Sequence, residues 1–132
     1  MIPDDLRFAK THEWVRVDSA GGQLVATLGI SHVAVEALTD LVYIELPEVG
    51  RQVDAGQACG EIESVKAVSD IYCPVSGEIT EVNAELPGKL QLLSDDPYGA
   101  GWIAKIRLSK PAEVVELLDR AAYERMCAEA GH

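Results

Sequence analysis

Aromatic residues are scarce in this chain of 132 residues: they make up only 5% of it, although 48% of its residues are hydrophobic. Its core must therefore consist mainly of valine, isoleucine, leucine and alanine. The hydrophobic fraction is too high for a disordered chain. The length suits a single domain with a core of its own, and we expect one domain over residues 1–132.

Basic residues are also few. Eleven lysines and arginines stand against 22 aspartates and glutamates, which gives a net charge of −11. This charge disfavours binding to a nucleic-acid backbone or an anionic membrane, and it attracts basic partner surfaces. The alternative is that the acidity only maintains solubility. We expect no nucleic-acid partner.

Long apolar runs are absent, and none approaches the ~20 residues that a bilayer span requires. The start of the sequence, residues 1–5, has neither a basic segment nor the hydrophobic stretch of a signal peptide. We therefore expect a cytoplasmic protein without a membrane partner.

The usual signals of a metal site or a catalytic centre are missing as well. The cysteines and histidines lie at scattered positions without metal-ligand spacing, namely Cys59, Cys73, Cys127, His12, His32 and His132. The sequence shows neither a nucleophile next to a base nor a phosphate-binding loop. We predict no metal, no catalytic residue and no enzymatic activity of its own.

Short runs rich in β-forming residues recur along the chain, and Gly- and Pro-containing turns separate them. The predicted strands cover residues 13–17, 24–28, 41–46, 58–64, 67–72, 77–82 and 102–108. Many short strands with this punctuation are typical of a sandwich or flattened barrel. The predicted fold class is mainly β.

Helices are expected in two places. Ser31 can cap a short helix that carries the apolar residues of 33–38. Near the end of the sequence, Pro111 suits a first helical turn, and the apolar residues of 114–121 follow at helical spacing. Helical character continues over residues 123–130.

A single lysine occupies the centre of the sequence. Lys66 is the only basic residue between Arg51 and Lys89, and it falls where two predicted strands meet, bracketed by Glu61, Glu63 and Asp70. Similar turns and strands flank it on both sides. This layout predicts a hairpin that presents one amine to a modifying enzyme, and the alternative is an ordinary solvated turn lysine.

Several motifs together carry a resemblance to a known family. They are T-H-E-W-V at 11–15, G-I-S at 29–31, E-L-P-E-V-G at 45–50, E-S-V-K-A-V-S-D at 63–70, P-V-S-G-E at 74–78, V-N at 82–83 and D-P-Y-G-A-G-W at 96–102. In order and spacing, the chain resembles the H protein of the glycine cleavage system over nearly its whole length. The resemblance implies one lipoyl-carrier domain over residues 1–132, with a lipoyl-domain-like flattened barrel and a lysine at a hairpin tip.

The resemblance also implies site residues. In this family the lysine of the E-S-x-K-A motif carries lipoic acid in amide linkage, which places the cofactor on Lys66. The lipoate ligase or transferase reads a glutamate three residues before the lysine and two glycines further away, and Glu63, Gly50 and Gly77 occupy these places. Glycines allow the left-handed backbone of tight turns, which would hold the hairpin in position.

The implied function is transport of an aminomethyl group. The lipoyl arm is loaded by glycine decarboxylase, unloaded by the aminomethyltransferase and reoxidised by dihydrolipoamide dehydrogenase. The loaded arm is expected to fold into a cleft whose polar lining maps onto Thr11, Glu13 and Asp70. The alternative for the two carboxylates is that Glu13 faces solvent on a half-exposed strand and Asp70 only ends a strand.

Departures from the family pattern keep a second function open. Val33 and Val35 stand where the family commonly has an aromatic or polar side chain near the presumed cleft. Cys59 and Cys73 each lie seven residues from Lys66, either as small buried residues or as a thiol pair that interacts with the lipoyl dithiol. The second function is that of an H-like lipoate-binding protein in sulfur oxidation, with heterodisulfide-reductase-like partners.

Overall fold

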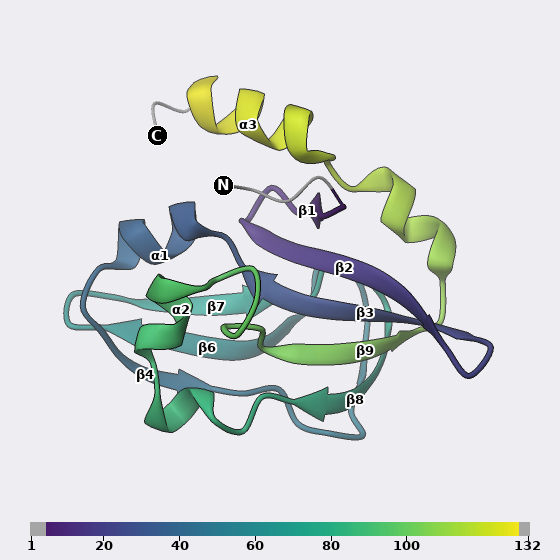
Figure 1. Ribbon diagram of the computed structural model, residues 1–132, viewed down its shortest axis with the longest axis horizontal. Helices are drawn as coiled ribbons and strands as arrows, with labels where there is room; N and C mark the ends of the chain where they lie inside the picture. Colours follow the sequence, from purple (N-terminus) through teal and green to yellow (C-terminus); the bar gives the residue numbers. More distant parts are fainter. Residues whose placement is uncertain (1–4, 130–132) are drawn as a thin grey trace.

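The computed structural model describes residues 5–129, whose strands form two sheets that pack face to face (Figure 1). The larger sheet has the strand order β1-β2-β3-β9-β8-β5. Its strands are β1 (Arg7–Phe8), β2 (Glu13–Ala20), β3 (Gln23–Ile30), β9 (Ala104–Leu108), β8 (Gly77–Val82) and β5 (Gln52–Val53). The smaller sheet has the order β4-β6-β7, with β4 (Leu41–Glu45), β6 (Ala58–Ser64) and β7 (Val68–Tyr72). All paired strands are antiparallel, and the predicted mainly β sandwich is confirmed.

The main core lies between the two sheets and contains no aromatic side chain among the residues described. Ile44, Ile62 and Ile71 contribute from the smaller sheet, and Leu28 and Ile106 from the larger one. Side chains alternate along each strand, so one face of each sheet supplies this core. The expectation that aliphatic residues build the core is confirmed.

Tyr43 and Tyr72 belong to the smaller sheet, whereas most of the aromatic side chains gather in a second cluster on the outer side of the larger sheet. Phe8, Trp14 and Tyr123 are fully buried there, and the rings of Phe8 and Tyr123 stack with centroids 4.1 Å apart. Tyr123 belongs to the C-terminal helix α3 (Arg120–Glu129), which lies above β1 in Figure 1 and contacts it. This cluster attaches the end of the chain to its beginning.

Strand positions follow the prediction closely. Residues 58–64 and 77–82 form β6 and β8 with the predicted bounds, and the other five predicted strands are present with ends shifted by up to three residues. The two-residue strands β1 and β5 were missed. Helix α1 (His32–Leu38) is present, and its predicted cap is confirmed because the Ser31 hydroxyl accepts the Ala34 N–H at 3.4 Å. The short helices η1 (Leu86–Gly88) and α2 (Gln91–Asp95) were not predicted.

The helix predicted over 111–121 is wrong in its middle. Residues Pro111–Glu116 form a 3₁₀ helix, η2, and the backbone then becomes extended at Leu117. The Leu118 N–H donates to the Phe8 carbonyl at 2.9 Å and the Leu118 carbonyl accepts from Phe8 at 2.7 Å. Because the backbone N–H and carbonyl of Leu118 form this β-bridge to a distant strand, they are not available for the hydrogen bonds of a helix. The predicted helix over 123–130 is part of α3, and residue 130 lies outside the described residues.

None of the helices in residues 5–129 has the length and apolar character needed to cross a membrane. The same residues contain no group of three or more His, Cys, Asp or Glu side chains placed to hold a metal ion.

Candidate functional site

Lys66 lies at the tip of the β6–β7 hairpin, where the loop between the paired residues Ser64 and Ala67 contains only two residues. The Ser64 N–H donates to the Ala67 carbonyl at 2.8 Å. The buried Ser64 hydroxyl accepts the N–H groups of Lys66 at 3.3 Å and Ala67 at 3.1 Å. The Val65 N–H donates to the Asp40 carbonyl at 3.0 Å. The backbone of the tip is thus held on several sides, while the Lys66 side chain is exposed.

The outer face of the smaller sheet is acidic. Ile44, Ile62 and Ile71 face the core, so the residues that alternate with them face outward. The pairs Glu45↔Glu61 and Glu61↔Asp70 place three carboxylates side by side on this face, and Glu63 pairs with Val68 closer to the tip. An acidic surface therefore extends from Lys66 along the outer face of β7.

Glu13 is buried, which rules out the alternative that it faces solvent. Its side chain is 2% exposed at the start of β2. One carboxyl oxygen accepts a short hydrogen bond from the Thr11 hydroxyl, and the other accepts the Tyr72 N–H at 3.1 Å. Burial raises the pKa of Glu13 to about 7, although these two hydrogen bonds oppose the shift.

Tyr72 connects the three residues expected to line the cleft. Its N–H binds Glu13, which also holds Thr11, and its hydroxyl lies 3.5 Å from the Asp70 carboxylate. Asp70 itself is exposed on the outer face. The structure therefore brings Thr11, Glu13 and Asp70 around one tyrosine that the sequence did not single out.

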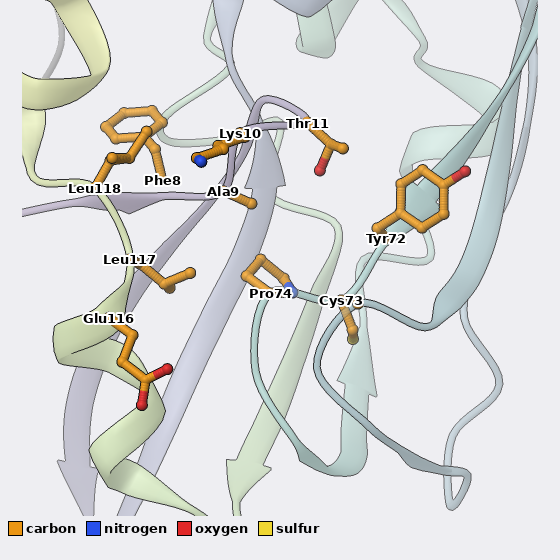
Figure 2. Close-up of a pocket in the computed structure, with 11 residues that line it drawn as sticks. Phe8, Ala9, Lys10, Thr11, Tyr72, Cys73, Pro74, Glu116, Leu117 and Leu118 are labelled. Carbon is orange, nitrogen blue, oxygen red and sulfur yellow. The ribbon is translucent and has the colours of Figure 1, made fainter. Parts of the chain in front are cut away.

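A cavity of about 300 Å³ adjoins this group. Its walls come from residues 8–11, 72–74 and 116–118, together with Gly56. Figure 2 shows Thr11 and Tyr72 on one side of it and Leu117 and Leu118 on the other. Because Val68, Asp70 and Tyr72 share one face of β7, that face leads from the Lys66 tip to this cavity.

The two glycines of the motif lie outside the hairpin: Gly50 is in the turn before β5, and Gly77 is the first residue of β8. Gly50 has φ 92°, and its N–H donates to the Ile79 carbonyl at 2.7 Å. Gly77 pairs with Val53, and a Cβ there would overlap the carbonyl oxygen of Arg107. Backbone geometry thus explains why both positions are glycine. Glu63, the third residue of the motif, is half-buried on the outer face near the hairpin tip.

The two aliphatic substitutions lie on α1, outside the cavity beside Thr11. Val35 packs in the main core and Val33 packs against the aromatic cluster, both from α1. Neither residue lines the cavity beside Thr11. Their aliphatic character therefore fits the packing of α1 and does not alter the cavity wall.

Cys59 and Cys73 are both buried and lie close together. The neighbouring residues Ala58 and Tyr72 pair across β6 and β7, and the Cys73 N–H donates to the Gln57 carbonyl at 2.9 Å. Each thiol is the largest influence on the pKa of the other, which is lowered for Cys59 and raised for Cys73. Cys59 is 5% exposed and Cys73 is 0% exposed. Figure 2 shows the Cys73 side chain directed away from Thr11, so the cavity meets the backbone of this residue. This burial disfavours direct contact with a dithiolane ring.

Sequence reasoning missed three residues that organise the site. They are Ser64, which holds the hairpin tip, Tyr72, and Tyr123, whose hydroxyl lies 2.6 Å from both His12 Nδ1 and Ser31 Oγ. The hydroxyl of Ser64 and its position two residues before Lys66 were available as a signal for a side-chain-stabilised turn. Nothing local indicated that Tyr123 reaches residues about 100 positions away.

The fold and the site define a class of protein: a small β-sandwich that presents one exposed amine on a rigid hairpin, which is the architecture of a swinging-arm carrier domain. The family model described as "Glycine cleavage H-protein" matches residues 6–130. The chain therefore belongs to the glycine cleavage H-protein family.

Individual relatives agree with this assignment. The chain is 54% identical to the glycine cleavage system H protein of Rhodopirellula baltica, over 98% of this chain and 97% of the relative. It is 50% identical to the H protein of Aeromonas hydrophila, over 97% of each chain. Among solved structures, the crystal structure of the glycine cleavage system H protein from Mycobacterium marinum matches with a TM-score of 0.84 and 41% identity, over 99% of this chain and all of the other.

Proposed function

We propose that this protein is the lipoyl carrier of a glycine cleavage system, with lipoic acid in amide linkage to Lys66. The observation that carries the proposal is the exposed lysine on a two-residue hairpin loop, within the E-S-V-K-A motif of a chain that belongs to this family. Amide formation needs an accessible amine, and the tip supplies one whose backbone is already fixed. Among the described residues, the Lys66 amine forms no ion pair that acylation would break.

The bound lipoyl group supplies a dithiolane that accepts an aminomethyl group at one enzyme and is reoxidised at another. The chain itself positions the arm. Ser64 fixes the backbone of the hairpin tip from which the arm extends. The outer face of β7 leads from this tip to the cavity beside Thr11. Carboxylates at Glu61 and Asp70 attract a cationic amine along this route.

The Glu13 carboxyl is suited to stabilise a positive charge in the cavity to which the outer face of β7 leads. Its carboxyl lies behind Thr11 and Tyr72, which line the cavity. With a pKa of about 7, it is partly protonated near neutral pH when no cation is near. An ammonium group beside it favours the carboxylate form, and the apolar walls from Leu117 and Leu118 keep water away from the cargo.

The partners that follow from this function are a lipoate ligase or transferase, glycine decarboxylase, the aminomethyltransferase and dihydrolipoamide dehydrogenase. The protein acts as a carrier subunit and not as an enzyme. A cytoplasmic location is part of the proposal, since these partners act on small water-soluble substrates. The sulfur-oxidation alternative has no support from the relatives named above, and a buried carboxyl beside the cavity suits an amine cargo better than a sulfur one.

The attachment site is tested by mass spectrometry after incubation with a lipoate ligase, lipoate and ATP. The wild type should gain one lipoyl group, on the peptide that contains Lys66. Lys66→Arg should gain none and keep the stability of the wild type, because the side chain is exposed. Lys89→Arg, at another exposed lysine, is the matched control and should be modified normally. Lipoylation that persists in Lys66→Arg would contradict the assignment of Lys66 as the attachment site.

The pathway is tested separately with the lipoylated protein. It should support the exchange of labelled bicarbonate into glycine by glycine decarboxylase. Its aminomethylated form should outlive free aminomethyl-lipoate, and Glu13→Ala together with Asp70→Ala should shorten that lifetime. Lipoylated protein that fails the exchange with a competent decarboxylase would show that the glycine function is wrong for this chain.

A further inference from the structure

The β6–β7 pairing contains an irregularity at Cys59 that the carrier function does not explain. In a regular strand, Cys59 would share the outward face of Glu61 and Glu63. The register shifts between Ala58 and Gly60, so the strand carries one extra residue there. Such a bulge re-aims a side chain, and here Cys59 joins the buried core. Cys73 enters the same core cluster from the residue after β7: Tyr72 pairs with Ala58, and the Cys73 N–H donates to the Gln57 carbonyl at 2.9 Å, so the two cysteines are cross-strand neighbours that both face inward.

A cation lies next to this pair. The guanidinium of Arg51 donates to the carbonyl of Ala58 at 3.3 Å, one residue before Cys59. The hydrogen bond from the Cys73 thiol lowers the pKa of Cys59, and Arg51 acts in the same direction, while burial and Glu13 oppose the shift. The second proton of the pair is held more tightly, because its loss would leave two buried thiolates together. Cys59 is therefore the thiol of the pair that loses its proton first, and Cys73 stays protonated.

We propose that Cys59 and Cys73 form a peroxide-sensitive thiol pair that closes reversibly to an intramolecular disulfide. The oxidant named in the proposal is hydrogen peroxide, because the burial of the pair, with exposures of 5% and 0%, excludes bulky disulfides. Cys127, which is also buried but belongs to the aromatic cluster, has no second cysteine beside it among the described residues.

The chemistry balances in two steps. The Cys59 thiolate attacks one peroxide oxygen, so that an S–O bond forms and the O–O bond breaks. The departing hydroxide takes up the proton released from Cys59 and becomes water. The sulfur of Cys73 then attacks the sulfenic sulfur of Cys59; the S–S bond forms, and the oxygen leaves as water with the Cys73 proton. Two thiols lose two electrons, and one peroxide is reduced to two waters.

The disulfide would join the two strands that carry Lys66 and would lie directly behind the cavity. Cys73 follows Tyr72, whose N–H holds the Glu13 carboxyl, and the backbone of Cys73 is part of the cavity wall. Oxidation would thus act on the wall of the candidate arm cleft, at a position distant from the hairpin tip. The thiol pair itself requires neither lipoate nor any partner, so it is tested on the unlipoylated protein, independently of the proposed function.

The experiment exposes the folded protein to hydrogen peroxide, alkylates the remaining thiols and digests with trypsin. Cleavage after Arg51, Lys66 and Lys89 separates the two cysteines onto the peptides 52–66 and 67–89. We expect these peptides to appear joined, and to separate on reduction with dithiothreitol, while Cys127 stays alkylated. Joined peptides that form only in urea, or a disulfide that includes Cys127, would overturn the proposal. Complete alkylation of Cys59 and Cys73 under conditions that oxidise a dithiol peptide would overturn it as well.

Two variants test the order of the steps. Arg51→Gln should slow the loss of free thiols by about threefold or more, since it removes the cation beside Cys59, whereas Arg16→Gln, at a half-buried arginine paired with Asp5, should not. An unchanged rate in Arg51→Gln would refute the role of the cation. Cys73→Ala should leave a Cys59 sulfenic acid that reacts with dimedone. If this variant does not fold, the peptide map of the wild type still decides the proposal.

Discussion

Replacing Glu13 with glutamine should remove a pH dependence of stability that the wild type carries. The pKa of this carboxyl is raised from 4.5 to about 7 in the folded protein. Between these values the folded state binds more protons than the unfolded state. The stability contribution of this group is therefore complete at low pH and is lost as the pH rises from 4.5 to 7.

The size of the effect follows from the shift. One pKa unit corresponds to about 1.4 kcal/mol, and over the interval from pH 5 to pH 8 the loss comes to about 2–3 kcal/mol. Little discount for solvent applies, because the side chain is 2% exposed. Glutamine has the same shape and no charge. Its oxygen can accept the Tyr72 N–H and its amide can donate to the Thr11 hydroxyl, so the local hydrogen bonds survive.

The assay is urea unfolding of unlipoylated wild type and Glu13→Gln at pH 5 and pH 8. The fall in unfolding free energy between the two pH values should be about 2–3 kcal/mol larger for the wild type than for the variant. Contributions from the other acidic groups are common to both proteins and cancel in this difference. Equal pH dependence in the two proteins would refute the claim that Glu13 titrates near neutral pH in the folded state.

Three further predictions concern the hairpin and the frame around it. Glu63→Ala should slow lipoylation by the ligase while changing the unfolding free energy by no more than about 0.5 kcal/mol, and unchanged modification kinetics would show that the enzyme does not read it. Gly77→Ala should cost about 3 kcal/mol or more in urea unfolding, because its Cβ would overlap the backbone of β9; Gly50→Ala, with open space around its Cβ, should cost only the ~1–2 kcal/mol of its left-handed backbone. Tyr123→Phe should lower the unfolding free energy by about 1–3 kcal/mol through the loss of two buried hydrogen bonds, and an unchanged value would show that they contribute nothing.

The sequence predicts the parts of the fold whose cause is local. Alternating side chains and turn residues define β6 and β8 to the residue, and a single hydroxyl at Ser31 predicts the start of α1. The two-residue strand β1 has no such local signature, because its pairing with β2 and with Leu118 is what makes it a strand. The same bridge ends η2, although the apolar spacing of residues 114–121 suits a continuous helix.

The candidate site likewise has one part with a local cause, which the sequence predicts, and one part that depends on distant residues. Lys66 and its hairpin follow from residues that are neighbours in the sequence. The state of Glu13 does not, because its burial depends on Tyr72, 59 residues further along the chain. The proximity of Cys59 and Cys73 depends on one bulge in β6, and the spacing of the two cysteines on either side of the hairpin could not reveal which face each would occupy.

The bridge between Phe8 and Leu118 also sets an order of events during synthesis of the chain. The hairpin that carries Lys66 is complete once residue 72 has been added, and its contacts are between close neighbours. The cavity wall, in contrast, needs residues 116–118 against residues 8–11, so it cannot exist until the last part of the chain has left the ribosome. Contacts between such distant segments form after local ones. The hairpin with the proposed attachment site therefore forms before the wall of the cavity is complete, and a chain that stops short of Leu118 would present the lysine without the complete cavity.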